Sequence, residues 1–265
     1  MAEGPITKFT LRVPGSGSCP EIADLIYFLS QNGVQHLVLR LPSKHNPYNL
    51  PSSFFTCLQL RHLTLKNCLI IPTPAFKGFD RLISLELCDV KISSKLLECF
   101  ISHCLLLEQL VLKISGVLID DIEISAPMLR SFDYTCNIRF VYLKNVPRLA
   151  NLSLKDGGYF HRAGTFTLAK FFESFFALEH LHLDNDSVKF FAGVGGAVLK
   201  RLLFDLNCVR CLYLSDFCLG ELEVTLCALF LIRSFPCLQY MEIEVDDGDN
   251  NIPALECLEA SSRMS

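Results

Sequence analysis

The sequence predicts an α/β protein built as a solenoid, with a parallel sheet on one face and helical or irregular returns on the other. Three observations support this prediction: a leucine pattern that recurs along the chain, alternating apolar and polar residues inside each copy, and apolar stripes at helical spacing between copies. The clearest copy, residues 60–70, fits the template L-x-x-L-x-L-x-x-N/C-x-L, with Ile70 in the last place. About nine irregular copies occur between Val34 and Ile243, which predicts a leucine-rich-repeat solenoid, or horseshoe.

The L-x-L centre of each copy predicts a short strand. Because alternate residues of a strand face opposite sides, the leucines are expected to point inward and the intervening residues outward. Strands of successive copies then pair in parallel along the concave face, and each copy buries its apolar side against its neighbours. The spacing between copies is irregular: 22 residues separate Leu63 from Leu85, and 31 residues separate Leu181 from Leu212. The longer steps leave room for a helix on the convex face.

The return segments are predicted from their apolar stripes and end signals. Helices are expected over residues 21–29, 95–104, 167–176 and 197–206. The shorter step from Phe132 to Leu152 predicts an extended or 3₁₀ return. The glycine-rich segment 193–196 is expected to be a loop turn ahead of the last helix, and the acidic segment 244–251 a flexible insertion. We expect a single domain over residues 1–265.

Composition and charge exclude several classes of protein. The chain is 51% hydrophobic and 20% charged, so it has enough apolar residues for a core and is not a disordered protein. A net charge of -4 gives no general attraction to nucleic acid or to acidic membrane surfaces. The chain has no apolar run of the roughly 20 residues that a membrane span needs, and it starts without a secretory signal. We expect a soluble protein of the cytoplasm, the nucleus or both.

No motif indicates catalysis, a cofactor or a metal. The 13 cysteines are odd in number and scattered, mostly within apolar runs, so they are predicted to be reduced core and strand residues. Cys208 and Cys211 form a C-x-x-C, but they are expected on different elements of an ordinary repeat, which disfavours a zinc or redox site. We expect no catalytic, cofactor-binding or metal-binding residues, no cofactor, and no enzyme activity.

The residues between the inward leucines are the candidate binding surface. They form a concave face whose early rows are mainly basic and whose last row is acidic, a polarity that could orient a protein target. The candidate protein-binding residues are Arg40, His62, Lys66, Glu86, Lys113, Asp133, Lys155, His180, His182, Asp184, Tyr213, Tyr240 and Glu242.

Two groups within this face stand out. His180, His182 and Asp184 alternate with inward leucines and are expected to project together from the concave side. They fit a protein contact, a solvated polar face or, less readily, a metal site, and the sequence leaves these alternatives open. Tyr213 and Tyr240 are the first candidates for anchoring a partner, because aromatic side chains dominate interface energetics.

Four phrases carry a family resemblance that covers most of the chain. They are residues 26–39 (IYFLSQNGVQHLVL), 50–63 (LPSSFFTCLQLRHL), 124–132 (ISAPMLRSF) and 232–243 (IRSFPCLQYMEI). The chain resembles the repeat region of the plant F-box/LRR proteins, including those of the F-box/FBD/LRR type. Residues 220–265 resemble the start of an FBD-type C-terminal region.

The resemblance implies the target-recognition part of an SCF-type E3 ubiquitin ligase receptor. In such receptors an F-box docks on a Skp-family adaptor and the cullin, while the repeats hold an unknown target protein. The F-box is absent from this sequence, so adaptor and cullin are expected partners only if an F-box lies upstream. The alternative is a repeat-only scaffold, decoy or regulatory binding protein with no part in ubiquitination. Neither nucleic acid nor a membrane is expected as a partner.

Overall fold

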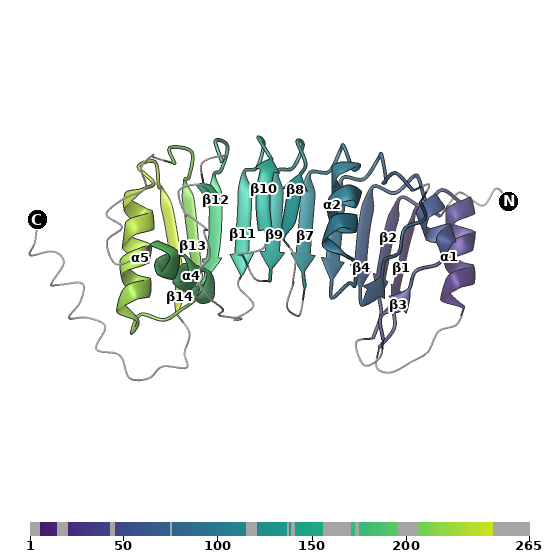
Figure 1. The fold of residues 1–265 in the computed structure, drawn as a ribbon, viewed down its shortest axis with the longest axis horizontal. Helices are drawn as coiled ribbons and strands as arrows, with labels where there is room; N and C mark the ends of the chain where they lie inside the picture. The colour runs from purple at the N-terminus through teal and green to yellow at the C-terminus, as the bar shows by residue number, and fades with distance from the viewer. Residues whose placement is uncertain are drawn as a thin grey trace, which may run out of the picture. The chain divides into compact units, whose positions relative to one another are not determined.

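The computed structural model divides into two compact units, residues Met1–Leu149 and Ala150–Ser265. Figure 1 labels their helices and strands. The described residues are 6–14, 21–42, 46–74, 76–114, 121–136, 138, 141–155, 171–172, 175–195 and 206–245. Both units repeat the same strand-and-return pattern, and the chain is an α/β leucine-rich-repeat solenoid. The single domain over residues 1–265 stays a prediction.

The first unit contains a parallel sheet in the order β1-β2-β4-β6-β7-β9. These strands are β1 (Lys8–Arg12), β2 (His36–Arg40), β4 (His62–Lys66), β6 (Ser84–Cys88), β7 (Gln109–Lys113) and β9 (Ser131–Thr135). The returns contain α1 (Ile22–Gln31), η1 (Ser52–Thr56) and α2 (Ser94–Ser102), the short parallel pair β3 (Tyr48–Asn49) and β5 (Cys68–Leu69), and the parallel pair β8 (Ile122–Ser125) and β10 (Val141–Asn145).

Equivalent leucines of this unit lie in register across the sheet. Leu37 pairs with Leu63, and Leu63 pairs with Leu85, so one row of apolar side chains crosses successive strands. All three are at most 2% exposed. Burying a leucine side chain contributes roughly 1.5–3 kcal/mol, so these rows contribute substantially to the stability of the unit. The predicted inward leucines are confirmed.

The returns of the first unit agree with their predictions. Ser93 caps α2, its side chain accepting a hydrogen bond from the Leu96 amide at 3.4 Å. α1 is followed by Gly33 at a φ of 66°, a left-handed conformation that glycine adopts without steric cost. The return between Phe132 and Leu152 contains the strand β10 and is therefore extended, as its length predicts.

Phenylalanines fill the space between the sheet and the returns of this unit. Phe79 meets Phe54 edge-to-face, with ring centroids 5.6 Å apart, and meets Phe100 in the same way at 5.7 Å. Edge-to-face packing is favourable for aromatic rings, because the positive edge of one ring faces the negative face of the other. This layer of rings packs η1 and α2 against one side of the strands. The other side of the strands faces away from these elements.

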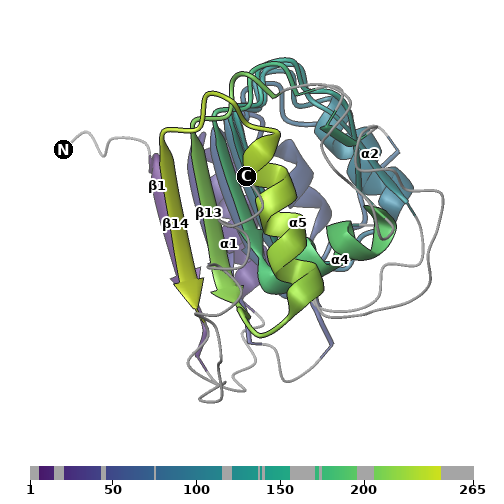
Figure 2. The same ribbon diagram turned by 90° about the vertical axis from the view of Figure 1, so that its left-hand side faces the viewer.

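The second unit contains a parallel sheet in the order β11-β12-β13-β14. Its strands are β11 (Asn151–Lys155), β12 (His180–Asp184), β13 (Cys211–Phe217) and β14 (Tyr240–Val245), and its helices are α4 (Asn185–Gly195) and α5 (Leu222–Arg233). Figure 2 shows α4 and α5 on the same side of β13 and β14, and the two helices contact each other. The other side of these strands is again a separate surface.

Several predictions about the returns of the second unit need correction or stay open. The turn expected over residues 193–196 is wrong, because α4 extends through Gly195. The glycines at 193, 195 and 196 indicate a loop, but β12 leads directly into the helix α4. Most of the helices expected over 167–176 and 197–206, and most of the insertion over 244–251, lie outside the described residues. The helix α5 was not predicted.

Candidate functional site

The candidate site is the side of the strands that faces away from the helices, which we call the strand surface. On the first three strands of the sheet it consists of Lys8, Thr10, Arg12, His36, Val38, Arg40, His62, Thr64 and Lys66. Parallel register aligns these residues in rows across the strands, such as Lys8 with His36 and His36 with His62. All nine are at least partly exposed.

Basic side chains gather in this part of the first unit. We call Lys8, Arg12, His36, Arg40, His62 and Lys66 the basic cluster. No outward position of β1, β2 or β4 carries an acidic residue. The chain as a whole has a net charge of -4, so the cluster differs in sign from the average of the molecule. Of its members, Arg40, His62 and Lys66 were among the predicted binding residues.

Lys8 and Arg12 were missed because β1 precedes the first recognisable leucine copy. The signal that could have found them is the alternation of Phe9, Leu11 and Val13 with polar residues, which is typical of a half-buried strand.

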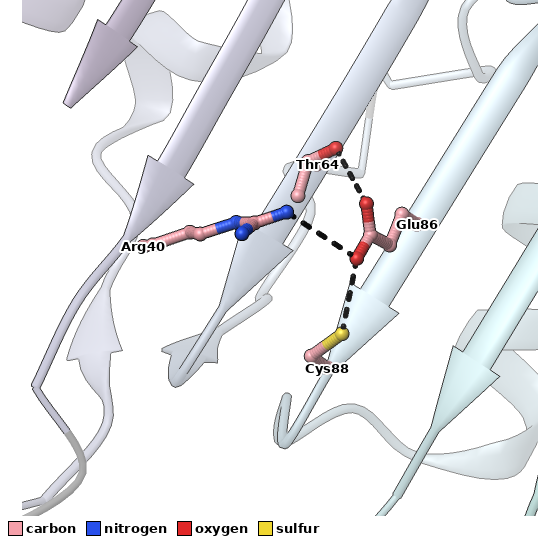
Figure 3. A network of polar contacts seen from close by, with 4 residues as sticks. All are labelled: Arg40, Thr64, Glu86 and Cys88. Atoms are coloured by element: carbon pink, nitrogen blue, oxygen red, sulfur yellow. Dashed lines mark hydrogen bonds and ion pairs between the residues drawn. The ribbon is translucent and has the colours of Figure 1, made fainter. Parts of the chain in front are cut away.

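Glu86, from β6, extends its carboxylate over the edge of the basic cluster (Figure 3). Its Oε1 lies 3.7 Å from the Arg40 guanidinium, and its Oε2 accepts a hydrogen bond of 3.0 Å from the Thr64 hydroxyl. The Cys88 thiol donates to Oε1 at 3.5 Å. The two charged side chains are 43% and 29% exposed, so the ion pair contributes at most about 1 kcal/mol. The predicted residues Arg40 and Glu86 are thus brought together from strands two apart in the sheet.

His36 and His62 stack within the cluster, with ring centroids 4.3 Å apart and an interplanar angle of 11°. The pKa of His62 is lowered below its usual value, first by desolvation and then by the positive charges of His36 and Arg61. Two imidazoles held this close cannot both be protonated without mutual repulsion. An anion bound beside the two rings would offset this repulsion.

Lys113 and Asp133 are the remaining predicted residues of the first unit. Lys113 is exposed on β7, in register with Cys88 of the neighbouring strand β6. Asp133 is half-buried on β9 and is in register with Val111. Both therefore occupy the strand surface, but β6 separates them from the basic cluster.

His182 lies at the centre of the strand surface in the second unit. Its Nδ1 is 3.3 Å from the Ser153 hydroxyl on β11, and its Nε2 is 2.9 Å from the Ser215 hydroxyl on β13. The ring meets Tyr213 edge-to-face at 6.3 Å. These contacts hold the imidazole in one orientation across three strands. His180 and Lys155 are half-buried at the two ends of the same surface.

Two tyrosines continue this surface toward β14. The rings of Tyr213 and Tyr240 lie 5.5 Å apart at an angle of 49°. The Tyr240 hydroxyl donates a 2.8 Å hydrogen bond to Glu242, and this bond raises the pKa of the tyrosine. Tyr240 is 48% exposed. The pair presents two amphipathic rings side by side, each with a hydroxyl that can bond to a partner.

The structure corrects the prediction for Asp184, which was expected to project with His180 and His182. Asp184 is 8% exposed, and its Oδ1 accepts a hydrogen bond of 2.9 Å from the Ser187 amide. The Ser187 hydroxyl also donates to this carboxylate. Asp184 directly precedes α4 and so acts as the N-cap of that helix. The strand alternation alone places Asp184 on the strand surface, as it does many residues that follow an inward leucine. The capping role depends on the helix α4 that begins at the next residue.

The described residues contain no group of three metal-ligating side chains. Cys208 donates from its thiol to the Phe176 carbonyl at 2.7 Å, while Cys211 begins β13, so the C-x-x-C is divided between two elements, as predicted. Five described cysteines are buried, among them Cys68, where burial raises the thiol pKa to about 12. Cys99, Cys208 and Cys237 are exposed and lie outside the strands, against the expectation of core and strand residues. No helix of the described part of the chain is long and apolar enough to cross a membrane.

Comparisons with known proteins connect this repeat to one group. Residues 22–243 match the family model described as FBD-associated F-box protein At5g56370, LRR repeats. The chain is also similar to the F-box/FBD/LRR-repeat protein At1g13570 of Arabidopsis thaliana, with 34% identity over 186 residues. That match covers 68% of this chain and 44% of the relative, so the chain corresponds to less than half the length of the protein it resembles.

Proposed function

Because this chain belongs to the plant F-box/FBD/LRR-repeat proteins, we propose that its strand surface recognises a target protein for an SCF-type ubiquitin ligase. In this role the chain binds and does not catalyse. The F-box that would dock on a Skp-family adaptor and the cullin belongs to a part of such proteins outside this sequence. The complex would act in the cytoplasm, the nucleus or both.

The observation that carries the proposal is the arrangement of Tyr213, Tyr240 and His182 on one exposed strand surface. Three rings from three adjacent strands lie edge-to-face or tilted against one another. Tyrosines supply large contact area with few rotatable bonds, which is why they are frequent at the centres of protein interfaces. The opposite side of the strands is occupied by the helices, so a partner can reach this sheet through the strand surface.

The proposal is tested with the full-length protein in plant cells, by proximity labelling combined with capture of the Skp-family adaptor. The test variant carries His180→Ala, His182→Ala and Tyr213→Ala. The matched control carries Lys95→Ala, His103→Ala and Tyr142→Ala, three exposed positions of the returns. Circular dichroism and thermal unfolding of the purified variants establish whether they fold.

We expect both variants to retain the adaptor and the strand-surface variant alone to lose a set of labelled proteins. Members of that set should then bind the purified wild-type protein directly. An unchanged set in a folded strand-surface variant would contradict target binding at this surface. If the full-length protein captures no adaptor while its target binding persists, the ligase role fails and a scaffold or decoy function replaces it.

A further inference from the structure

The first unit carries a concentration of positive charge that the proposed role in target recognition does not by itself explain. The three adjacent strands β1, β2 and β4 present all six residues of the basic cluster and no acidic residue at their outward positions. Lys8, Arg12 and Lys66 take part in no ion pair with the described residues. An exposed cluster of one sign on a chain of net charge -4 is a steering surface for a partner of opposite sign.

We infer that the basic cluster binds an acidic, extended segment of the target protein. The inference rests on the proposed role of the strand surface and adds the chemistry of the partner. Carboxylates of the segment would pair with Lys8, Arg12 and Lys66, while the methyl-bearing side chains of Val38 and Thr64 contact its backbone and small residues between them.

The dimensions of the cluster fit a short peptide. Neighbouring strands lie about 4.8 Å apart, so the three strands place their outer rows within roughly 10 Å. Along one strand, the first and last outward residues, such as Lys8 and Arg12, are separated by about 13 Å. An extended peptide advances about 3.3 Å per residue, so carboxylates at every second position recur about every 7 Å and reach both ends of the cluster.

Glu86 shows that this surface accommodates a carboxylate. Its carboxylate accepts a hydrogen bond from the Thr64 hydroxyl and lies beside the Arg40 guanidinium. These are the contacts expected for a carboxylate of a bound peptide. Glu86 also competes with such a peptide for Arg40. Removing its charge should therefore strengthen the binding of an acidic segment, a gain that general disturbance of the surface would not produce.

A protein segment fits better than a nucleic acid. Both candidate partners are polyanions, so charge alone does not distinguish them. Single-stranded nucleic acids also use exposed aromatic rings to stack their bases. The rings in the cluster, His36 and His62, are stacked on each other.

The test uses the whole chain and a fluorescent peptide of about eight residues alternating Asp and Ser, long enough to cross the cluster. The same peptide with Asn in place of Asp and an oligothymidylate of equal charge serve as comparison probes. Three variants are compared with wild type: Arg12→Glu with Arg40→Glu and Lys66→Glu; Glu86→Gln; and a control of equal charge change, Lys77→Glu with Lys91→Glu and Lys95→Glu. The control positions are exposed and lie outside the strand surface.

We expect the Asp peptide to bind wild type more tightly than the Asn peptide and to weaken about tenfold or more in the triple strand variant, beyond the control. Glu86→Gln should tighten binding by about two- to fivefold. Equal binding of the Asp and Asn peptides, equal losses in the strand and control variants, or tighter binding of the oligothymidylate would each overturn the inference.

The outcome separates this inference from the proposed function. A target whose binding needs His180, His182 and Tyr213 but tolerates the charge reversal in the basic cluster would refute the acidic segment and leave target recognition intact. A target set unaffected by either change refutes the proposed function, whatever the peptide does.

Discussion

His36 and His62 lie face to face on adjacent strands, with their ring centroids 4.3 Å apart. The groups that face His62 are His36 on β2, Ser84 on β6, with which it is in register, and Arg61 immediately before it. No acidic group is among them. The pKa of His62 is lowered in this environment, so the ring is neutral in the free protein near neutral pH.

This relationship predicts that the affinity for the Asp peptide rises as the pH falls. A bound carboxylate favours the protonated ring, so binding raises the pKa of His62 and takes up a proton. Affinity should therefore increase between about pH 7 and pH 5.5, above the range in which the peptide carboxylates are protonated. Fluorescence anisotropy across this range measures the slope. His62→Gln should reduce the slope, and an affinity that is constant or falls with decreasing pH in wild type contradicts the account.

A second prediction concerns the capping role of Asp184. Asp184→Ala removes the acceptor for the Ser187 amide and leaves that buried residue with fewer hydrogen bonds. The free energy of unfolding should fall by about 1–2 kcal/mol, the usual cost of losing a helix N-cap. Urea denaturation followed by circular dichroism gives the value. Asp184→Asn, which keeps an acceptor oxygen, should lose less, and equal losses in both variants would indicate that the carboxylate does not cap α4.

A third prediction compares inward and outward positions on one strand. Leu85 is fully buried, and Leu85→Ala should destabilise the protein by about 2–5 kcal/mol because it leaves a cavity in the row of leucines. Its neighbour Glu86 is on the strand surface, so Glu86→Ala should change the unfolding free energy by less than about 1 kcal/mol. Chemical denaturation of both variants checks the orientation of β6. Similar losses would contradict the inward and outward assignment.

A fourth prediction follows from the buried thiols. Burial raises the pKa of Cys57 and Cys104 from 9.0 to about 11, and the pKa of Cys68 and Cys227 from 9.0 to about 12. Below pH 9.0 the thiols are protonated in both states, and their contribution to stability is fully present. It is lost as the pH rises toward the folded-state pKa values, because the unfolded chain releases these protons first. The midpoint of urea unfolding should therefore fall as the pH is raised above 9.0.

The same thiols should resist alkylation, because the reactive species is the thiolate. Brief treatment with iodoacetamide, followed by mass spectrometry, should modify the exposed Cys99, Cys208 and Cys237 and spare Cys68 and Cys227 until denaturant is added. Modification of Cys68 at the rate of Cys99 in the native protein would show that β5 is more accessible than the structure indicates.

The strand pattern was predictable because its cause is local. The alternation of leucines with other residues determines which side each residue faces, and this placed Arg40, His62 and Tyr213 on the strand surface from sequence alone. The contacts among these residues were not predictable. They depend on register across strands from distant parts of the chain, as with Arg40 and Glu86.

Two kinds of residue escaped the sequence pattern for physical reasons. Lys8 and Arg12 belong to a strand that carries Phe9 and Leu11 in place of the leucine pair and lies before the first clear copy. Asp184 satisfies the strand alternation, but the helix that follows β12 uses its carboxylate as a cap. The competing signal at that point was the glycine-rich segment 193–196, which suggested a loop where α4 extends to Gly195.

A target protein is proposed to contact the strand surface. Photo-crosslinking with p-benzoylphenylalanine in plant cells tests it most directly, with the full-length protein carrying the probe at Val38 or Tyr213 on the strand surface, or at Lys95 on α2. We expect crosslinks to a shared target from at least one strand position and none to that target from Lys95. A target crosslinked from Lys95 and from neither strand position would contradict it.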